Sequence, residues 1–282
     1  QKGMVITMKK MKAAFIGFLP EAGDVYQTLE DYAKIGYRAF EGGDLLFEKG
    51  DPAENLKRVE AIGMKPLAVS CNFLQDQAPD PKEILRKVKK IGVSMAVCYC
   101  GRAGAYRFGG TDRQPTYDEL MKECEAMDSV AKELEKEGVS LAFHNHDAEF
   151  SVMVRGVPAH YLMAANTQYL KFELDTGWAD FGGYNPVSIM KELGDRLAMV
   201  HIKDYVPAVT TERPQAPDGR HIVVPVFTSP GTGALDLQGC LETAQALGIE
   251  YATVEQDTLN NLSWRQALQA GYLNMRETGI VE

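Results

Sequence analysis

LAFHNHDAEF, residues 141–150, leads a short apolar run into two histidines that are separated by one asparagine. The apolar residues 140–143 are too few for an ordinary helix and suit a buried strand. Side chains alternate along a strand, so we expect His144 and His146 to share one face and Asn145 to point away from them. Two imidazoles at the end of a core strand suit metal ligation or proton transfer. Two solvated histidines in a loop are the alternative.

Three later apolar runs end in residues of similar chemistry. They are FELD at 172–175, VH at 200–201 and VE at 254–255. One such ending carries little information, but four of them form a pattern. The pattern favours a shared site over isolated solvated side chains.

Short apolar runs alternate with amphipathic segments from residue 11 onward. Eight alternations in about 250 residues predict an α/β fold with parallel strands, a (β/α)8 TIM barrel. An open, doubly wound sheet is the rival, but it usually has fewer strands. We expect strands at 12–19 (ending at Pro20), 38–41, 66–71, 94–100, 140–143, 170–175, 197–203 and 251–255. We expect helices at 24–35, 52–62, 81–91, 117–137, 158–165, 186–193, 237–247 and 264–278.

These elements fill the chain, so we expect one barrel domain over residues 1–282, with residues 1–10 as an N-terminal extension. Hydrophobic residues make up 45% of the chain and charged residues 24%, which is typical of a globular protein. The net charge of −9 argues against binding to nucleic acid, and no apolar stretch is long enough to span a membrane. A homo-oligomer stays open.

The cysteines number five and form no CxxC pair, which favours reduced thiols and a cytoplasmic protein. The start, QKGMVITM, lacks the long apolar segment of an intact signal peptide, and a removed export signal is the alternative.

Polar residues that end different barrel strands become neighbours at one mouth of the barrel. Asp175 and Glu255 directly follow apolar runs, and a buried carboxylate needs a charged partner or a metal. Two carboxylates with one or two imidazoles suit Mn²⁺, Co²⁺, Mg²⁺, Fe²⁺ or Zn²⁺. An internal ion-pair network is the alternative. The candidates are His144, His146, Glu173, Asp175, His201, Lys203, Glu255 and Asp257.

FHNHDAEF, FELDTGWAD, MVHIKDY and TVEQD, in this order, resemble the xylose isomerase-like barrel family, also called sugar phosphate isomerases/epimerases. The resemblance covers roughly residues 11–280 and includes the HNH form of one large branch. It implies one divalent metal held by residues that close strands five to eight. Carried over to this chain, these ligands are Asp175, His201, Glu255 and a histidine of the HNH stretch, for which we prefer His144 and keep His146 as the alternative.

The same resemblance implies a metal-dependent isomerase or epimerase that acts on a small sugar or keto-sugar. Its epimerases shuttle a proton with two metal-bound glutamates, and here His144 replaces the first of them. We therefore expect His146 and Glu255 to transfer protons. Lys203 could stabilise an enolate, or form a salt bridge with Asp204 or Asp257 instead. The alternatives are a keto-inositol dehydratase, a keto-glycoside lyase or a non-catalytic sugar-binding barrel. An endonuclease acting on abasic DNA ranks behind them, because it needs more metal ligands and a basic groove.

Several other polar or aromatic residues at strand ends could contact the substrate. Trp178 stands where the epimerases of the family have a substrate-contacting histidine, and the loop residues 231–233 are GTG instead of the family's Gly-Glu-Gly. The long loops 101–115 and 206–235 could be lids or plain surface excursions. The expected substrate-binding residues are Glu149, Trp178, Asn72, Glu41 and Asp257, with buried structural roles as the alternative for Glu41 and Asn72.

Overall fold

A computed structural model describes residues 8–19, 23–73, 78–216 and 218–282. Residues 1–7 of the expected N-terminal extension lie outside the described residues, as do Pro20, the expected end of the first strand, and Pro217 of the second long loop.

Within the described residues, nine strands form one parallel sheet in the order β3-β2-β1-β13-β10-β9-β6-β5-β4. The two edge strands are halves of one extended segment, because β3 pairs with β2 and β4 pairs with β5. The sheet is therefore closed through this segment, and the predicted TIM barrel is confirmed. The strands are β1 (Lys12–Phe15), β2 (Ala39–Phe40), β3 (Lys65–Pro66), β4 (Val69–Ser70), β5 (Met95–Cys98), β6 (Ser140–His144), β9 (Lys171–Asp175), β10 (Leu197–Ile202) and β13 (Tyr251–Val254).

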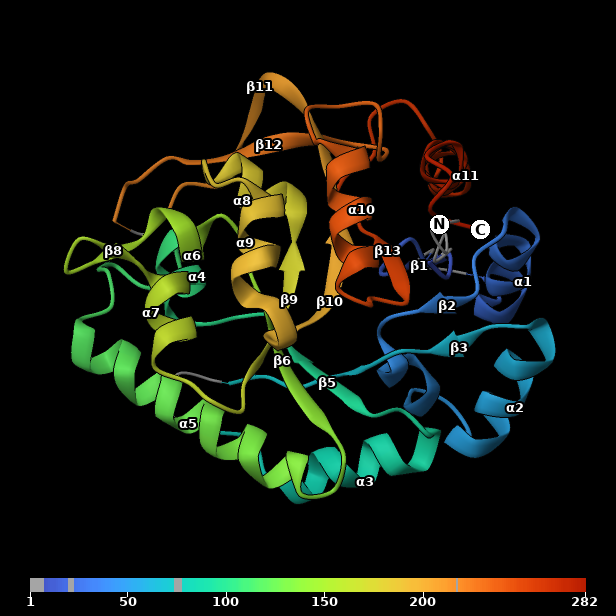
Figure 1. Cartoon of the computed structure of the whole chain (residues 1–282), viewed down its shortest axis with the longest axis horizontal. Coiled ribbons are helices and arrows are strands. Elements are labelled where there is room, and N and C mark those ends of the chain that lie inside the picture. The colour runs from blue at the N-terminus through green and yellow to red at the C-terminus, as the bar shows by residue number, and fades with distance from the viewer. Residues whose placement is uncertain (1–7, 20–22, 74–77, 217) are drawn as a thin grey trace, which may run out of the picture.

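Amphipathic helices connect the strands and lie outside the sheet (Figure 1). Aspartates 24, 51 and 80 accept hydrogen bonds from the first turns of α1, α2 and α3, which explains where these helices begin. Every predicted helix is present within about two residues of its expected bounds. The helices are α1 (Val25–Ile35), α2 (Pro52–Ile62), α3 (Pro81–Ile91), α5 (Tyr117–Glu135), α7 (Ala159–Ala165), α9 (Pro186–Leu193), α10 (Leu237–Ala246) and α11 (Trp264–Glu277).

The first strand is shorter than the sequence predicts. It ends at Phe15, and Gly17 and Phe18 adopt positive φ angles of 73° and 58°. This backbone conformation is incompatible with an extended strand, so the chain leaves the sheet before Leu19.

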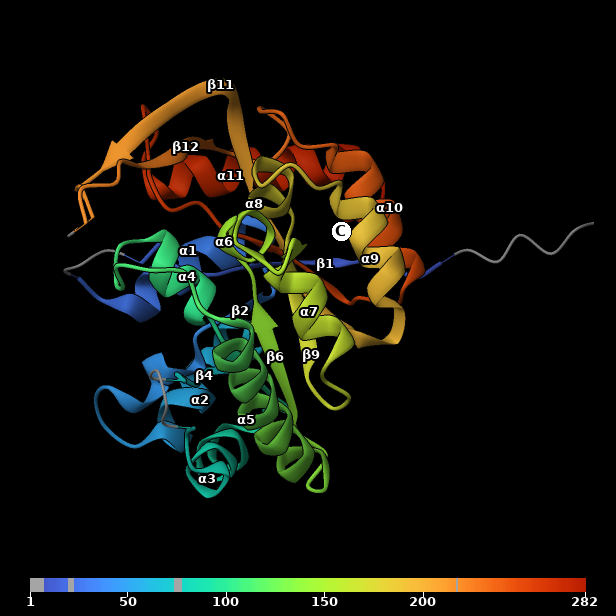
Figure 2. The same cartoon turned by 90° about the vertical axis from the view of Figure 1, so that its left-hand side faces the viewer.

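The long segment after β10 is a β-hairpin and not the irregular loop that the sequence predicted. β11 (Asp204–Arg213) pairs antiparallel with β12 (Ile222–Thr228). Apolar side chains of β12, including Phe227, pack against Trp178 of the short helix α8 (Thr176–Phe181). Figure 2 shows both hairpin strands over α8. The hairpin therefore covers part of the barrel end at which β9 and β10 finish.

Further short elements also surround this end or close turns elsewhere. The other long loop contains α4 (Arg102–Arg107), and α6 (Ala148–Ser151) follows β6. None of the described helices combines the length and the apolar composition that a membrane crossing requires. The remaining elements are β7 (Met153–Val154), β8 (Val157–Pro158) and the 3-10 helices η1 (Gly43–Phe47) and η2 (Gly194–Arg196).

Candidate metal centre

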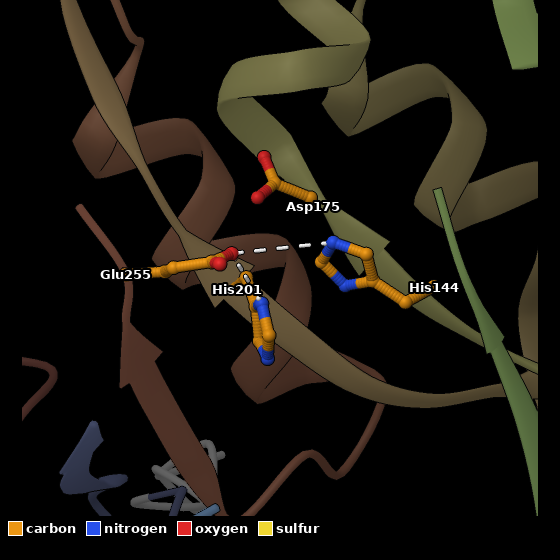
Figure 3. Close-up of side chains that lie close together, drawn as sticks. All are labelled: His144, Asp175, His201 and Glu255. Carbon is orange, nitrogen blue, oxygen red and sulfur yellow. Dashed lines mark hydrogen bonds and ion pairs between the residues drawn. The ribbon is translucent and has the colours of Figure 1, made fainter. Parts of the chain in front are cut away.

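Four neighbouring strands bring two imidazoles and two carboxylates together at the mouth of the barrel. His144 ends β6, Asp175 ends β9, His201 lies near the end of β10, and Glu255 follows β13. One potential ligand atom from each of these residues lies within 4.8 Å of all the others. Figure 3 shows the four side chains converging on one space. The strand ends in the sequence predict this set, and its role as a ligand set stays a prediction.

Asp175 is held by the backbone of Trp178 and by Asn145. Its Oδ1 accepts a hydrogen bond of 2.8 Å from the backbone N–H of Trp178, which caps α8. The Asn145 amide accepts from the backbone N–H of Asp175 (3.0 Å) and donates to its carbonyl (3.2 Å). Asn145 therefore ties β6 to β9. The Oδ2 of Asp175 accepts no hydrogen bond within the described part of the chain and lies 3.3 Å from Nζ of Lys203.

The two histidines each present one nitrogen to the cluster and the other to buried carboxylates. His201 Nδ1 lies 2.8 Å from Glu255 Oε2, and its Nε2 lies 2.9 Å from Glu41 Oε2. His144 Nε2 lies 4.0 Å from Glu255 Oε2, and its Nδ1 lies 3.1 Å from Glu173 Oε2. Both rings are thereby fixed in orientation.

The two imidazoles differ in their affinity for a proton. Burial, and after it the charge of His201, lowers the pKa of His144 to about 3. His144 is therefore neutral near pH 7 and has a lone pair for a metal. Burial alone would lower the pKa of His201, but the carboxylates of Glu173, Glu41 and Glu255 outweigh it and raise this pKa well above its ordinary value. His201 thus carries a proton where no metal ion supplies positive charge.

Glu255 and Asp175 respond differently to the same surroundings. Burial would raise the pKa of both carboxyl groups. For Glu255, the charges of Lys203 and His201 outweigh burial and hold the pKa well below its usual range. For Asp175, burial prevails and the pKa is raised. Glu255 is therefore the more acidic of the two carboxyl groups.

Lys203 is the ammonium group of the site and is 1% exposed. Its Nζ lies 3.0 Å from Glu255 Oε2 and 3.0 Å from Asp257 Oδ1. Burial would lower its pKa, but the carboxylates of Asp175, Glu255 and Asp257 outweigh burial and raise it. Lys203 also lies over the ring of Trp178, 5.1 Å from its centroid. Of the two salt bridges expected from the sequence, the structure shows the one with Asp257.

Asp204, the other expected partner of Lys203, binds backbone groups of the loop after β12 instead. Its carboxylate accepts hydrogen bonds of 2.9 Å from the backbone N–H groups of Gly231, Gly233 and Leu235. It fixes the turn after β12, which includes the GTG sequence. The predicted site residue Asp257 is thus at the cluster, and Asp204 supports the loop beside it.

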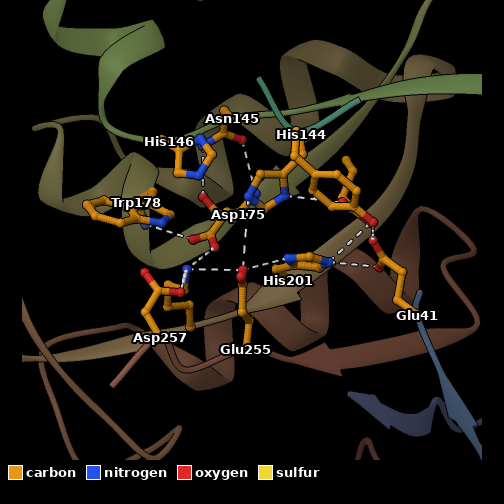
Figure 4. A network of polar contacts seen from close by, with 12 residues as sticks. Glu41, His144, Asn145, His146, Asp175, Trp178, His201, Glu255 and Asp257 are labelled. Carbon is orange, nitrogen blue, oxygen red and sulfur yellow. Dashed lines mark hydrogen bonds and ion pairs between the residues drawn. The ribbon is translucent and has the colours of Figure 1, made fainter. Parts of the chain in front are cut away.

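His146 lies beside the cluster on an aromatic wall. Its ring centroid is 5.0 Å from that of His144 and 5.6 Å from that of Trp178 (Figure 4). The ring centroid of Phe108, on the chain after α4, is 5.4 Å away. Burial lowers its pKa well below the ordinary value, so the ring is neutral at pH 7. Its backbone N–H donates to Glu149 Oε2 at 2.7 Å. His146 is half-buried and next to the cluster, as strand alternation predicted.

The predicted substrate-binding residues fall into three groups. Trp178 is fully buried beside His146, and Asp257 contacts Lys203. Glu149 and Glu41 are also buried, and burial raises the pKa of Glu149 to about 8 and that of Glu41 to about 7. Asn72 is exposed after β4, and no hydrogen bond between described residues joins it to the cluster. Whether each contacts a substrate stays a prediction.

Two residues beside the histidines have no role predicted from the sequence. Glu173 was a strand-end candidate without a function, and it lies against His144 and His201. Tyr99 was not singled out, and its hydroxyl donates to Glu41. The alternation of FELD places Glu173 on the same face as Asp175, which was the available signal. No pattern in the sequence pointed to Tyr99.

Residues 29–276 match the family model described as the xylose isomerase-like TIM barrel. The chain belongs to this family. The match includes all four strand ends of the cluster.

The chain is also similar to individual proteins. Inosose dehydratase from Geobacillus kaustophilus (strain HTA426) is 25% identical over 237 residues, which cover 77% of this chain and 76% of that protein. A sugar phosphate isomerase/epimerase from Parabacteroides distasonis ATCC 8503 has a TM-score of 0.70 at 19% identity, covering 98% of this chain and 97% of that one. The IOLI protein, solved with a bound zinc atom, has a TM-score of 0.69 at 17% identity, covering 95% of this chain and 98% of that one. These structural likenesses concern the fold.

The donor set fits a divalent cation. It offers a neutral imidazole, a second imidazole, and a buried aspartate oxygen that accepts no hydrogen bond from the described residues. Several buried or partly buried carboxylates surround the single ammonium group of Lys203. The site therefore keeps negative charge that a cation would neutralise. Nitrogen and oxygen ligands without thiolate suit Zn²⁺, Mn²⁺, Co²⁺ or Fe²⁺, and an oxygen-rich set also suits Mg²⁺.

Proposed function

We propose that the protein is a divalent-metal-dependent isomerase or epimerase that moves a proton on the carbon next to the carbonyl group of a small sugar or keto-sugar. The cluster of His144, Asp175, His201 and Glu255 is the observation that carries this proposal. These four residues would hold the metal. A metal bound there would act as a Lewis acid that polarises the carbonyl group.

The protein's own groups supply the proton transfers. His146 is neutral, half-buried and beside the cluster, so it can accept a proton from a substrate carbon. Glu255 is ionised and can act as the second acid–base group. Lys203 keeps its proton and can stabilise negative charge that develops on the substrate oxygen.

The aromatic side chains beside these groups give the site a wall suited to the apolar face of a sugar. Trp178 and Phe108 both flank the ring of His146. Trp178 is fully buried and Phe108 is half-buried, so the two rings would exclude water from one side of the catalytic groups and strengthen the electrostatic interactions there. We include Trp178, Glu149, Asp257, Glu41 and Asn72 in the proposed substrate-binding set, as the sequence suggested.

A second candidate function is dehydration of a keto-inositol, or elimination from a keto-glycoside. The 25% identity with an inosose dehydratase over 77% of this chain favours it. In such an elimination His146 would take the proton next to the carbonyl group. The leaving oxygen would be protonated by an acid and depart as water from a keto-inositol, or as an alcohol from a keto-glycoside. Both reactions begin with the same proton transfer.

The experiment is a screen of keto-sugars, keto-inositols and 3-keto-glycosides in deuterated water with Mn²⁺ added. We expect at least one compound to incorporate deuterium next to its carbonyl group. A product of unchanged composition identifies an isomerase or epimerase, and a product that has lost water identifies a dehydratase. His146→Gln should lose most of this turnover and keep its metal. His221→Gln, which changes an exposed histidine of the hairpin, should keep both its turnover and its metal.

The outcomes separate the proposal from its alternatives. A compound that binds but never exchanges its proton would indicate a non-catalytic sugar-binding barrel. His146→Gln turning over like the wild type would remove His146 from the proposed chemistry.

The five cysteines are all free, and we propose on this ground that the protein works in a reducing compartment such as the cytoplasm.

A further inference from the structure

Glu173 lies one layer deeper in the barrel than the proposed metal ligands. It is two residues before Asp175 on β9, so both side chains point to the barrel interior. Glu173 is 0% exposed, and a buried carboxylate of this kind needs compensating contacts. Two imidazoles provide them. Its Oε2 is hydrogen-bonded to His144 Nδ1 at 3.1 Å, and its Oε1, which has no hydrogen bond among the described residues, lies 3.2 Å from His201 Nε2 as an ion pair.

The two histidines turn opposite nitrogens to Glu173. His144 uses Nδ1 for this contact and directs Nε2 to the cluster, whereas His201 uses Nε2 and directs Nδ1 to the cluster. At His201 the hydrogen bond of Nε2 goes to Glu41 Oε2 at 2.9 Å, and Glu173 lies beside it. The hydroxyl of Tyr99 donates to the other oxygen of Glu41 and fixes that carboxylate.

We propose that Glu173 is a positioning residue that lies between the two metal-binding histidines and sets the tautomer of His144 and, together with Glu41, that of His201. A carboxylate only accepts hydrogen bonds, so Nδ1 of His144, which faces Glu173, and Nε2 of His201, which faces Glu41 and Glu173, each carry a proton. His144 is then the Nδ1–H tautomer and His201 the Nε2–H tautomer. The remaining lone pairs, on Nε2 of His144 and Nδ1 of His201, face the metal site. This inference rests on the proposed function, because it assumes the metal.

A second metal between Glu41, Glu173 and His201 is the competing explanation, since their potential ligand atoms lie within 4.8 Å of one another. The contacts favour hydrogen bonds instead. His201 Nε2 is already at hydrogen-bond distance from both carboxylates, and a Tyr99 hydroxyl occupies the other oxygen of Glu41. A metal there would have to remove the proton from Nε2 and leave His201 bridging two ions. The metal stoichiometry distinguishes the two explanations.

The first test is metal affinity, measured by competition of Zn²⁺ against a fluorescent chelator, which needs no substrate. Glu173→Gln keeps the size of the side chain but offers one acceptor oxygen and one donor NH₂ group. It can satisfy one imidazole N–H and opposes the other, so we expect Zn²⁺ affinity to fall by about 10- to 100-fold. Glu123→Gln is the matched control, because Glu123 is another buried glutamate that accepts a hydrogen bond away from the cluster.

The second test reads the tautomers of the wild type directly, and it holds even if Glu173→Gln fails to fold. Long-range ¹H–¹⁵N spectra of the Zn²⁺-loaded protein should show His144 protonated on Nδ1 and His201 protonated on Nε2. Dialysis should give one Zn²⁺ per chain. Opposite tautomers, two ions per chain, or unchanged affinity in a folded Glu173→Gln would each overturn the inference. If the wild type binds no metal at all, the proposed metal site itself has failed, whereas weak binding of Glu173→Gln alone supports the positioning role of Glu173.

Discussion

Replacing Lys203 with methionine should destabilise the metal-free protein much more than it destabilises the metal-bound protein. Lys203 is 1% exposed, and Asp175, Glu255 and Asp257 all lie within 3.3 Å of its ammonium group. Methionine keeps most of the apolar stem but leaves these carboxylates without their cation. A divalent ion held by Asp175 and Glu255 would neutralise the same charges, so bound metal should restore much of the loss.

The magnitude follows from the burial of the pair. Removing one partner of a buried ion pair costs about 3–5 kcal/mol, because the charge left behind has no compensation. A domain of this size loses roughly 2 °C of Tm per kcal/mol, so the metal-free variant should melt roughly 6–10 °C below the wild type. Lys12→Met is the matched control. Lys12 lies 3.0 Å from Glu250, the same distance as Lys203 from Glu255, but its side chain is 31% exposed. An exposed pair contributes at most about 1 kcal/mol.

Differential scanning calorimetry in chelator and in excess Mn²⁺ measures both effects. We expect a large Tm loss for Lys203→Met in chelator, a smaller loss in Mn²⁺, and little change for Lys12→Met in either buffer. Equal melting of Lys203→Met and wild type in chelator would refute the claim that Lys203 compensates the buried acids. Equal losses in chelator and in Mn²⁺ would show that metal and lysine do not share the same carboxylates.

Two further predictions concern stability outside the catalytic chemistry. Burial raises the pKa of Glu123 to about 7, so the folded state binds its proton more tightly than the unfolded state does. The protonated carboxyl group therefore adds about 3 kcal/mol to the free energy of unfolding below about pH 4.5. This contribution is lost as the pH rises through 7. Urea unfolding at about pH 5 and pH 8 should therefore show a smaller loss with rising pH for Glu123→Gln than for wild type, and identical losses would contradict the assignment. Asn145→Ala removes both hydrogen bonds between β6 and the backbone of Asp175 and should cost roughly 1–3 kcal/mol in urea unfolding. Asn166→Ala, which removes an exposed hydrogen bond to Leu162, should cost much less, and equal costs would show that the Asn145 bridge adds nothing.

The barrel was predictable because its signals are local. Alternating apolar runs and amphipathic helices follow from side-chain periodicity, and aspartates at the helix starts mark the boundaries. The convergence of the four strand ends was also predictable, because parallel barrel strands finish at one mouth. The strand ends alone were sufficient to group four residues without any distance, namely His144, Asp175, His201 and Glu255.

The buried layer beneath these residues was not predictable from the chain alone. It depends on the stagger between strands, which places His144 opposite Glu173 and His201 opposite Asp175. No single strand contains that information. The contact of Glu41 with His201 joins residues 160 positions apart, and the hydroxyl of Tyr99 reaches Glu41 from another strand. The β11–β12 hairpin was missed because its prolines suggested an irregular loop.

The metal content of protein prepared without chelator tests the central claim most directly. Elemental analysis should find about one divalent ion per chain in the wild type. Asp175→Ala should lose it, because this residue supplies the buried oxygen that accepts no hydrogen bond from the described part of the chain. Asp195→Ala, which changes an aspartate of η2 away from the cluster, should keep it. A wild type that holds no metal when supplied with Mn²⁺ or Zn²⁺, or an Asp175→Ala variant that retains the full amount, would contradict the account.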